Sequence, residues 1–222
     1  MVIDPGHGGD QKGAVGPRGT KEKDIALAIS KKVANQIRKK TGARVYLTRS
    51  GDKTLSLEAR DSFAVKKNAD LFISIHANAS TKRNMSGIET YYLNNATDRA
   101  AQKLASRENR ASKKKVSDVE HILSTMLQNV DTVESRKLAI KVQGSLMKRM
   151  KKKYPGVKNR KVRSALFYVL VGAKCPAILV ETSFISNPRE EKLLRNKYYQ
   201  DHLSIAIADG VKRYMRTQSA SL

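Results

Sequence analysis

Two nearly continuous apolar runs constrain the fold of this chain more than any other feature. They are "DLFISIHAN", from Asp70 to Asn78, and "AILVETSFI", from Ala177 to Ile185. A strand that faces water on one side alternates apolar and polar residues, whereas a run without that alternation suits a central strand buried on both faces. Such strands lie in sheets that helices cover on both sides, so the two runs predict a layered α/β protein.

Shorter sequence patterns predict the remaining strands and helices. Further strands are predicted at Val2 and Ile3, at "ARVYLTR" (residues 43–49) and, with alternating character, at "GIETYYL" (residues 87–93). Apolar residues recur at helical spacing over residues 24–40, 56–69 and 202–216. A chain of 222 residues with 40% hydrophobic residues can bury one good core, so residues 1–222 are expected to form a single domain.

The stretch between residues 94 and 162 differs from its surroundings, because it is strongly basic and has no convincing strand pattern. Two helical faces are nevertheless visible in it. They are Val119, Ile122, Leu123, Met126, Leu127 and Val130, followed by Leu138, Val142, Leu146 and Met150. Residues 95–153 are therefore interpreted as a helical, basic insert within the domain.

The charge of the chain predicts an anionic partner. The formal net charge is +24, which favours nucleic acid, an anionic membrane surface or an anionic polymer such as a cell wall. Nucleic acid is the least favoured of the three, since there is no Trp and aromatic residues make up only 5%. The chain as given has neither a leader-like segment nor a long apolar run, so neither a signal peptide nor a membrane span is predicted in it.

Four side chains that can bind a metal or transfer a proton follow predicted strands. His7 follows the first strand, Glu22 closes the glycine-rich loop after it, His76 ends "LFISIH" in the first apolar run, and Glu181 ends "AILVE" in the second. Ligands of open α/β sheets bind at the carboxyl ends of the strands, so these four residues are candidates for one site. Two histidines and a carboxylate, with a fourth position left to water, form a common catalytic zinc set.

Each residue also has a simpler interpretation. Either histidine could be an ordinary loop or core residue, and Glu22 could be a first-turn acid favoured by the helix dipole. Glu181 is harder to explain in this way, because burial of a carboxylate is costly unless it is paired, hydrogen-bonded or functional. His121 and His202 fall within predicted helices and are interpreted as structural or solvent-facing.

Four successive segments resemble one known family. "VIDPGHGGDQKGAVGPRGTKEKDIAL", "LFISIHANAS", "GIETYYL" and "AILVETSFISNPREEKLL" are similar, in order, to the motifs of the zinc-dependent N-acetylmuramoyl-L-alanine amidases of the AmiA, AmiB and AmiC type. The resemblance covers nearly the whole chain. It implies a twisted, mainly parallel sheet of about six strands flanked by helices.

The resemblance also implies a chemistry. His7, Glu22 and His76 correspond to the ligands of one Zn²⁺ ion, and Glu181 corresponds to the catalytic glutamate. The implied substrate is peptidoglycan, cleaved at the amide between the lactyl group of N-acetylmuramic acid and L-alanine of the stem peptide. A periplasmic or cell-envelope location follows from that substrate.

A regulatory role for the insert follows from the same resemblance. In division-associated amidases an inserted helical segment covers the active site until an activator displaces it, and a LytM-type activator docking on residues 95–153 is expected here. "LASRENRAS" is similar to the stretch whose glutamate reaches the zinc, which makes Glu108 the candidate blocking ligand. The "KKK" that follows departs from the acidic and glycine-containing pattern of that family.

Other functions remain open at this level. The same metal and base would serve a zinc peptidase or a deacetylase acting on the cell wall, and only the resemblance separates them from an amidase. A basic nucleic-acid-binding module and a catalytically inactive wall-binding domain are the alternatives outside enzymes.

Overall fold

The computed structural model describes residues 1–111 and 130–219. Its centre is a six-stranded sheet in the order β2-β1-β3-β6-β4-β5. The strands are β1 (Val2–Pro5), β2 (Tyr46–Leu47), β3 (Phe72–Asn78), β4 (Ile88–Leu93), β5 (Asn159–Ala165) and β6 (Ala177–Phe184).

The strands are parallel except where β4 pairs with β6. The two apolar runs of the sequence are the adjacent central strands β3 and β6, and every residue in both is buried. The predicted α/β class with a mainly parallel sheet of about six strands is confirmed. Because β1, β3 and β6 run in the same direction, their carboxyl ends meet at one edge of the sheet.

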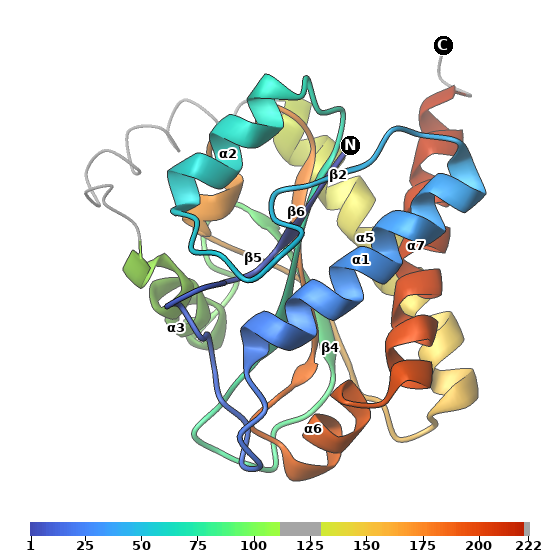
Figure 1. The fold of residues 1–222 in the computed structure, drawn as a ribbon. Helices are drawn as coiled ribbons and strands as arrows, with labels where there is room; N and C mark the ends of the chain where they lie inside the picture. The colour runs from blue at the N-terminus through green and yellow to red at the C-terminus, as the bar shows by residue number, and fades with distance from the viewer. Residues whose placement is uncertain (112–129, 220–222) are drawn as a thin grey trace.

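Helices cover both faces of the sheet (Figure 1). One face packs against α1 (Glu22–Thr41), α5 (Val130–Lys153) and α7 (Lys197–Ser219). The other face packs against α2 (Leu57–Lys66), α3 (Arg99–Glu108) and the 3₁₀ turn η2 (Tyr168–Leu170). The turn η1 (Asn109–Ala111) follows α3 directly, and α6 (Pro188–Leu194) precedes α7.

Helix α5 belongs to the main core. Leu138, Val142, Leu146 and Met150, one of the two helical faces predicted in the basic region, have no exposed surface. They pack with α7 and the sheet in one hydrophobic cluster. Most of the other predicted face, from Val119 to Leu127, lies outside the described residues.

One strand was missed, and the strand predicted at residues 87–93 is confirmed but more buried than its alternating pattern indicated. Residues 94–162, in which no strand was predicted, contain the start of β5. Its sequence "NRKVRSA" is too basic to resemble a strand. It forms the edge of the sheet, where exposed positions tolerate charge. The strand β4 is buried on both faces and not on one, because α5 covers one side of it and α3 lies over the other.

Within the described residues, no helix combines the length and apolar character that crossing a membrane would require.

Candidate metal centre

The candidate site lies at the carboxyl edge of the sheet, where three central strands end. His7 follows β1 after one glycine, and His76 lies near the end of β3. Glu181 on β6 is directly opposite His76 in the parallel register. Glu22 is the first residue of α1, so the loop between β1 and α1 returns its carboxylate to the same edge.

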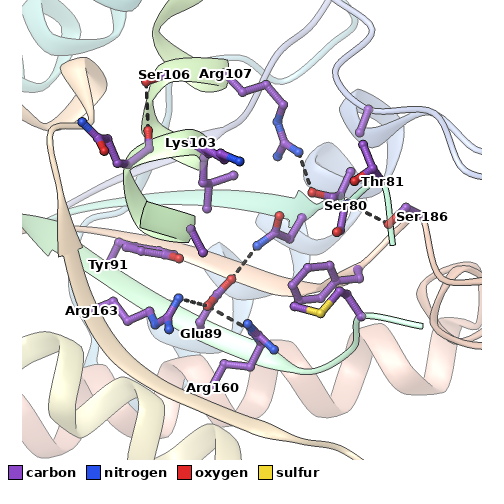
Figure 2. Close-up of a pocket in the computed structure, with 18 of the residues that line it drawn as sticks. Ser80, Thr81, Glu89, Tyr91, Lys103, Ser106, Arg107, Arg160, Arg163 and Ser186 are labelled. Carbon is purple, nitrogen blue, oxygen red and sulfur yellow. Dashed lines mark hydrogen bonds and ion pairs between the residues drawn. The ribbon is translucent and has the colours of Figure 1, made fainter. Parts of the chain in front are cut away.

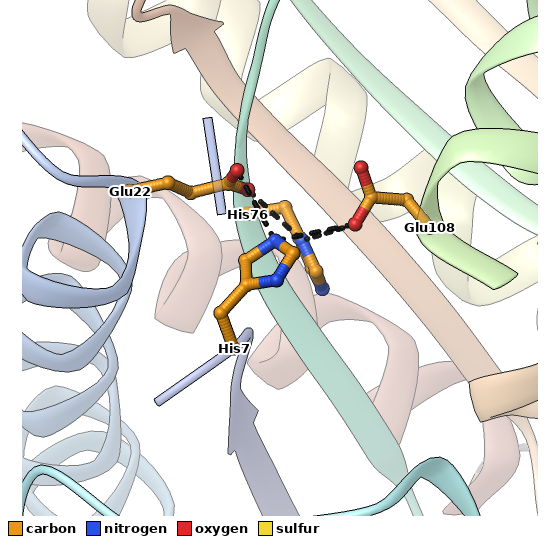
Figure 3. A group of neighbouring side chains, drawn as sticks. All are labelled: His7, Glu22, His76 and Glu108. Atoms are coloured by element: carbon orange, nitrogen blue, oxygen red, sulfur yellow. Dashed lines mark hydrogen bonds and ion pairs between the residues drawn. The ribbon is translucent and has the colours of Figure 1, made fainter. Parts of the chain in front are cut away.

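Two histidines and two glutamates converge there (Figure 3). Their potential ligand atoms, one from each of His7, Glu22, His76 and Glu108, all lie within 4.8 Å of one another. His7 Nε2 is 3.1 Å from Glu22 Oε2 and 3.2 Å from Glu108 Oε2. His76 Nδ1 is 3.0 Å from Glu22 Oε1 and 3.4 Å from Glu108 Oε2.

Two atoms of the cluster have no hydrogen bond to a described residue and are therefore free to bind a metal. His7 Nε2 and Glu108 Oε2 are buried and close together, yet neither makes a hydrogen bond in the described part of the chain. Imidazole nitrogens and carboxylate oxygens in this number are the ligands that zinc takes in proteins.

The backbone at His7 is strained in order to present the ring. His7 has φ of 56°, a left-handed conformation that costs a non-glycine residue on the order of 1–3 kcal/mol. Arg60 Nη2 donates to its carbonyl oxygen at 2.8 Å and so stabilises this turn. Gly6 must lack a side chain, because a Cβ there would lie 2.5 Å from the His76 ring.

Glu22 is fixed by backbone donors before any metal is considered. Its carboxylate accepts hydrogen bonds from Ala14 N at 2.8 Å and Ala77 N at 3.1 Å, and from the His76 ring. Burial favours the neutral acid, but the two adjacent histidines outweigh it and hold the pKa of Glu22 well below its usual range. Glu22 is therefore an ionised, pre-oriented ligand.

The pKa values of His7 and Glu108 are also shifted, each toward its charged form. Burial opposes a charge on His7, but the Glu22 carboxylate and then the Glu108 carboxylate raise its pKa to about 10. Burial and the Glu22 charge oppose ionisation of Glu108, but both histidines outweigh them and lower its pKa. The site thus favours positive charge at its centre, which a proton or a metal cation can supply.

Glu181 is enclosed beside this cluster. Its side chain has no exposed surface, and neither carboxylate oxygen has a hydrogen-bond partner among the described residues. Burial, followed by repulsion from Glu22 and Glu108, raises the pKa of Glu181 well above its usual range. A carboxyl group in this environment binds a proton strongly, as a general base and acid must.

Some residues that support the site were not predicted. Asp4 accepts from Arg60 Nη1 at 2.7 Å, from Thr48 Oγ1 at 2.5 Å and from Ser74 Oγ at 2.8 Å beneath the His7 loop. Arg49 donates to the carbonyls of Pro5 and Gly6, and to that of Lys23. Both arginines are almost fully buried, and nothing in a single sequence distinguishes them from surface arginines.

The structure therefore brings His7, Glu22, His76 and Glu108 into one cluster and places Glu181 on the strand next to His76. His202 lies on α7, away from the cluster, where Arg149 Nε donates to its Nδ1 at 3.2 Å. His121 lies outside the described residues.

An α/β sheet with such a cluster at its carboxyl edge defines a protein with a metal-competent hydrolytic site. The comparisons with known proteins identify the family. The sequence model described as N-acetylmuramoyl-L-alanine amidase matches residues 1–213. The chain belongs to the N-acetylmuramoyl-L-alanine amidase family and is a peptidoglycan amidase, as the resemblance in its sequence predicted.

Individual relatives agree in sequence and in structure. N-acetylmuramoyl-L-alanine amidase AmiA of Escherichia coli K12 is 39% identical over 219 residues, which cover 96% of this chain and 75% of that protein. AmiC of Escherichia coli O6:H1 is 37% identical, and the match covers 96% of this chain and 52% of AmiC. The amidase from Clostridium difficile 630 superposes with a TM-score of 0.76 at 32% identity, over 97% of this chain and 95% of that one. AmiC2 of Nostoc punctiforme gives 0.74 at 31%, over 97% and 96%.

Proposed function

We propose that the chain hydrolyses the amide between N-acetylmuramic acid and L-alanine in a zinc-dependent reaction, and that α3 holds the site closed. The observation that carries the proposal is the cluster of four ligand atoms within 4.8 Å, next to a buried glutamate whose oxygens have no hydrogen-bond partner in the described chain. Belonging to the amidase family supplies the substrate.

His7 Nε2, His76 Nδ1 and a Glu22 oxygen would hold the zinc ion. When bound, zinc would lower the pKa of a water molecule and polarise the scissile carbonyl. The hydrogen bonds from Ala14 N and Ala77 N orient the Glu22 carboxylate for this role. The strained turn and Arg60 do the same for His7.

Glu181 is the general base and acid of the proposal. It accepts a proton from the attacking water as the new carbon–oxygen bond forms, and it delivers that proton to the leaving nitrogen as the carbon–nitrogen bond breaks. The products are the free lactyl carboxylate and a stem peptide with an amino terminus at L-alanine. The raised pKa of Glu181 suits both transfers, because the proton is held firmly between them.

Helix α3 supplies the inhibitory part of the proposal. Its last residue, Glu108, lies within 3.2 Å of His7 Nε2 and 3.4 Å of His76 Nδ1, where a carboxylate would fill the fourth ligand position. Arg107 fixes this arrangement, since it donates to Glu108 Oε1 through Nε at 2.9 Å and to the Ala79 carbonyl at 2.8 Å. Because α5 packs in the main core, α3 is the part of residues 95–153 to which we assign the blocking role.

Displacement of α3 requires a partner, for which a LytM-type activator remains our proposal. One relative supports protein partners in the family. The CwlD amidase from Clostridioides difficile, with a TM-score of 0.74 and 28% identity, was solved in complex with the GerS lipoprotein. We propose that this chain acts in the periplasm or cell envelope, where its substrate lies.

The products released from purified peptidoglycan test the proposal. Free stem peptides that begin with L-alanine are expected, and their release should stop when zinc is removed by a chelator and return when zinc is added. New termini inside the peptide would indicate a peptidase, and released acetate a deacetylase. Unchanged peptide release after verified zinc removal would contradict the zinc dependence.

A further inference from the structure

A cavity of about 810 Å³ opens over the strands that follow β3 in the sheet, next to α3 (Figure 2). It lies between α3, the loop after β3 and the strands β4, β5 and β6. Two of its lining residues contact the metal cluster, since Ala14 N donates to Glu22 and Arg107 Nε donates to Glu108. Pockets for small ligands fall between about 300 and 1,000 Å³, so the cavity can hold a short peptide. In the amidase proposed above, it is the space next to the scissile bond.

The cavity is basic. Its charged lining residues are Arg160 and Arg163 of β5, with Lys103, Arg107 and Arg110 of α3 and η1, against the single acid Glu89. Since α3 is displaced in the active state proposed above, the two arginines of β5 are the ones that stay for the substrate. Such a lining favours an anionic ligand. In the proposed substrate the lactyl carboxyl of the sugar is consumed in the amide, so the negative charge near the bond is carried by the stem peptide.

Arg160 has a geometry suited to bind a carboxylate. Its Nε donates to Glu89 Oε2 at 3.3 Å, and its guanidinium lies 5.2 Å from the centre of the Phe184 ring. Within the described residues its two terminal amino groups donate no hydrogen bond. The guanidinium is thus held in place while two parallel N–H donors remain for a ligand, as bidentate carboxylate binding requires.

The other residues around Arg160 are already engaged. Arg163 forms ion pairs through both terminal amino groups: Nη1 lies 3.7 Å from Glu89 Oε2, and Nη2 lies 2.7 Å from Asp98 Oδ2. Glu89 also accepts from Asn78 Nδ2 at 2.5 Å. Among the residues on the sheet, this leaves Arg160 as the one that offers charged donors to the cavity.

The distance from the reacting atoms selects which carboxylate would be bound. Glu89 on β4 is directly opposite Glu181 on β6, and Arg160 lies on the next strand, β5. Neighbouring strands are about 4.8 Å apart, so the backbone of Arg160 is roughly 10 Å from that of Glu181. A peptide extends roughly 3.5 Å per residue, so a carboxylate on the second residue lies roughly 7 Å from the scissile nitrogen. That reach is of the same order as the spacing between the two strands, so a carboxylate on the second residue falls within the range of the Arg160 guanidinium.

We propose that Arg160 is a specificity-determining residue that binds the free carboxylate of the second stem-peptide residue. The proposal rests on the amidase function proposed above. Stem peptides in which this carboxylate is amidated would then be poorer ligands and poorer substrates.

Two pairs of synthetic compounds test this proposal. L-alanyl-D-glutamate and L-alanyl-D-isoglutamine, each with its γ-carboxyl blocked as a methylamide, differ only in whether the α-carboxyl of the second residue is a carboxylate or an amide. Calorimetry measures their affinity for the full chain without any need for turnover. The wild type should prefer the carboxylate by about tenfold or more, the worth of a charge-assisted bidentate contact. Arg160→Gln should abolish the preference, and Arg160→Lys, which keeps the charge but loses the fork, should retain only part of it.

Arg83→Gln is the matched control, because Arg83 is an exposed arginine of the loop after β3 that does not line this cavity. It should leave the preference unchanged, and thermal melting should establish that all variants are folded. Equal affinity of the wild type for both peptides, no binding of either, or a preference that survives Arg160→Gln would each overturn the role of Arg160.

The corresponding N-acetylmuramoyl dipeptides separate this proposal from the amidase function. Cleavage of both at the muramoyl–alanine bond, without preference, would overturn the role of Arg160 and leave the amidase proposal intact. A carboxylate preference in the binding measurement, with no cleavage of either compound by the wild type or by Glu108→Ala, which lacks the proposed blocking carboxylate, would count against the amidase proposal alone.

Discussion

Some single residues at this site reduce the stability of the protein while they serve its proposed function. His7 is strained and Glu181 is buried without a hydrogen-bond partner in the described chain, and both features cost stability. Side chains that are kept at such a cost are expected at functional positions. The expectation can be tested separately for the proposed ligand and for the proposed base.

Substitution of Glu181 by Gln should remove catalysis and keep the metal. A positioned general base contributes about 10²- to 10⁴-fold, so the rate of peptide release should fall by at least about 100-fold, with zinc content unchanged by atomic absorption. His7→Ala is the contrasting variant and should lose zinc together with activity. Parental turnover in the Glu181 variant, or full zinc occupancy in the His7 variant, would refute the corresponding role.

Asp4 should make the stability of the protein depend on pH. Burial opposes its ionisation, but Arg60, Thr48 and Ser74 outweigh it, so the pKa of Asp4 is lowered from 3.8. A lowered pKa in the folded state stabilises the protein above about pH 4, and this contribution is lost as the pH falls through the folded-state pKa. Asp4→Asn leaves Arg60 buried without its counterion and should reduce the free energy of unfolding by about 3 kcal/mol at neutral pH.

Urea unfolding at several pH values measures this effect. The difference between wild type and Asp4→Asn should shrink below about pH 4, where Asp4 begins to be protonated in the unfolded chain. Asp24→Asn, at an exposed position in the first turn of α1, should change stability by less than about 1 kcal/mol. The interpretation fails if the two variants behave alike.

The sequence predicted the residues that approach the metal position but not those that support them. His7, His76 and Glu181 could be found because each interrupts an apolar or glycine-rich pattern. Arg60 and Glu89 could not, because a charged residue in an amphipathic helix or an alternating strand is ordinarily exposed. Their burial is a consequence of tertiary packing, which a single sequence does not encode locally.

At the level of elements, α3 should act as a removable cover. Glu108→Ala removes the carboxylate between the histidines and should raise basal amidase activity several-fold without any activator. Arg99→Ala, at the exposed start of the same helix, serves as the control and should leave activity unchanged. Unchanged or lower activity in a folded Glu108→Ala protein would count against autoinhibition.

The packing of α5 on α7 depends on one glycine. Ala is favoured over Gly in helices by about 1 kcal/mol, yet a Cβ at Gly210 would lie 2.5 Å from Val142 Cα. Since that contact is to backbone, one helix must move, and overpacking of this kind costs about 1–3 kcal/mol. Gly210→Ala should therefore lower the free energy of unfolding by about 1 kcal/mol or more.

Gly144 on α5 gives the opposite expectation. No atom lies within 4 Å of a Cβ at this exposed position, so Gly144→Ala should stabilise the protein by about 0.5–1 kcal/mol through helix propensity alone. Denaturant unfolding of both variants decides the matter, and a stabilised Gly210→Ala would mean that the two helices can separate without cost.

Elements were predicted well where packing makes their pattern uniform. The strands β3 and β6 are buried on both faces, and their unbroken apolar runs identified them. Strand β5 was not predicted because its outer positions are basic. Helix α7 begins five residues before its predicted start at His202, because the tyrosines and polar residues there do not show a helical period of apolar residues.

For the molecule as a whole, the positive charge is distributed over surfaces away from the site and is also present in the site. Some lysines of α1 are neutralised by α7, as in the pairs of Lys32 with Asp201 and of Lys40 with Asp209. The end of α5, residues 151–153, is a run of exposed lysines with no ion pair to any residue that the structure describes. A net charge of +24 spread in this way acts at long range and is not directed to one contact.

Binding to the wall polymer should consequently depend on salt, whereas catalysis on a small neutral substrate should not. The screening length falls from about 30 Å at about 0.01 M salt to about 3 Å at about 1 M, so long-range attraction is lost over that range. The fraction of protein that sediments with purified peptidoglycan should fall several-fold. In contrast, kcat/KM should change by less than about twofold for N-acetylmuramoyl-L-alanyl-D-isoglutamine whose γ-carboxyl is blocked as a methylamide, which leaves the compound uncharged. Equal sedimentation at both salt concentrations would mean that the charge does not drive wall binding. A parallel fall in both quantities would instead indicate that salt disturbs the site itself.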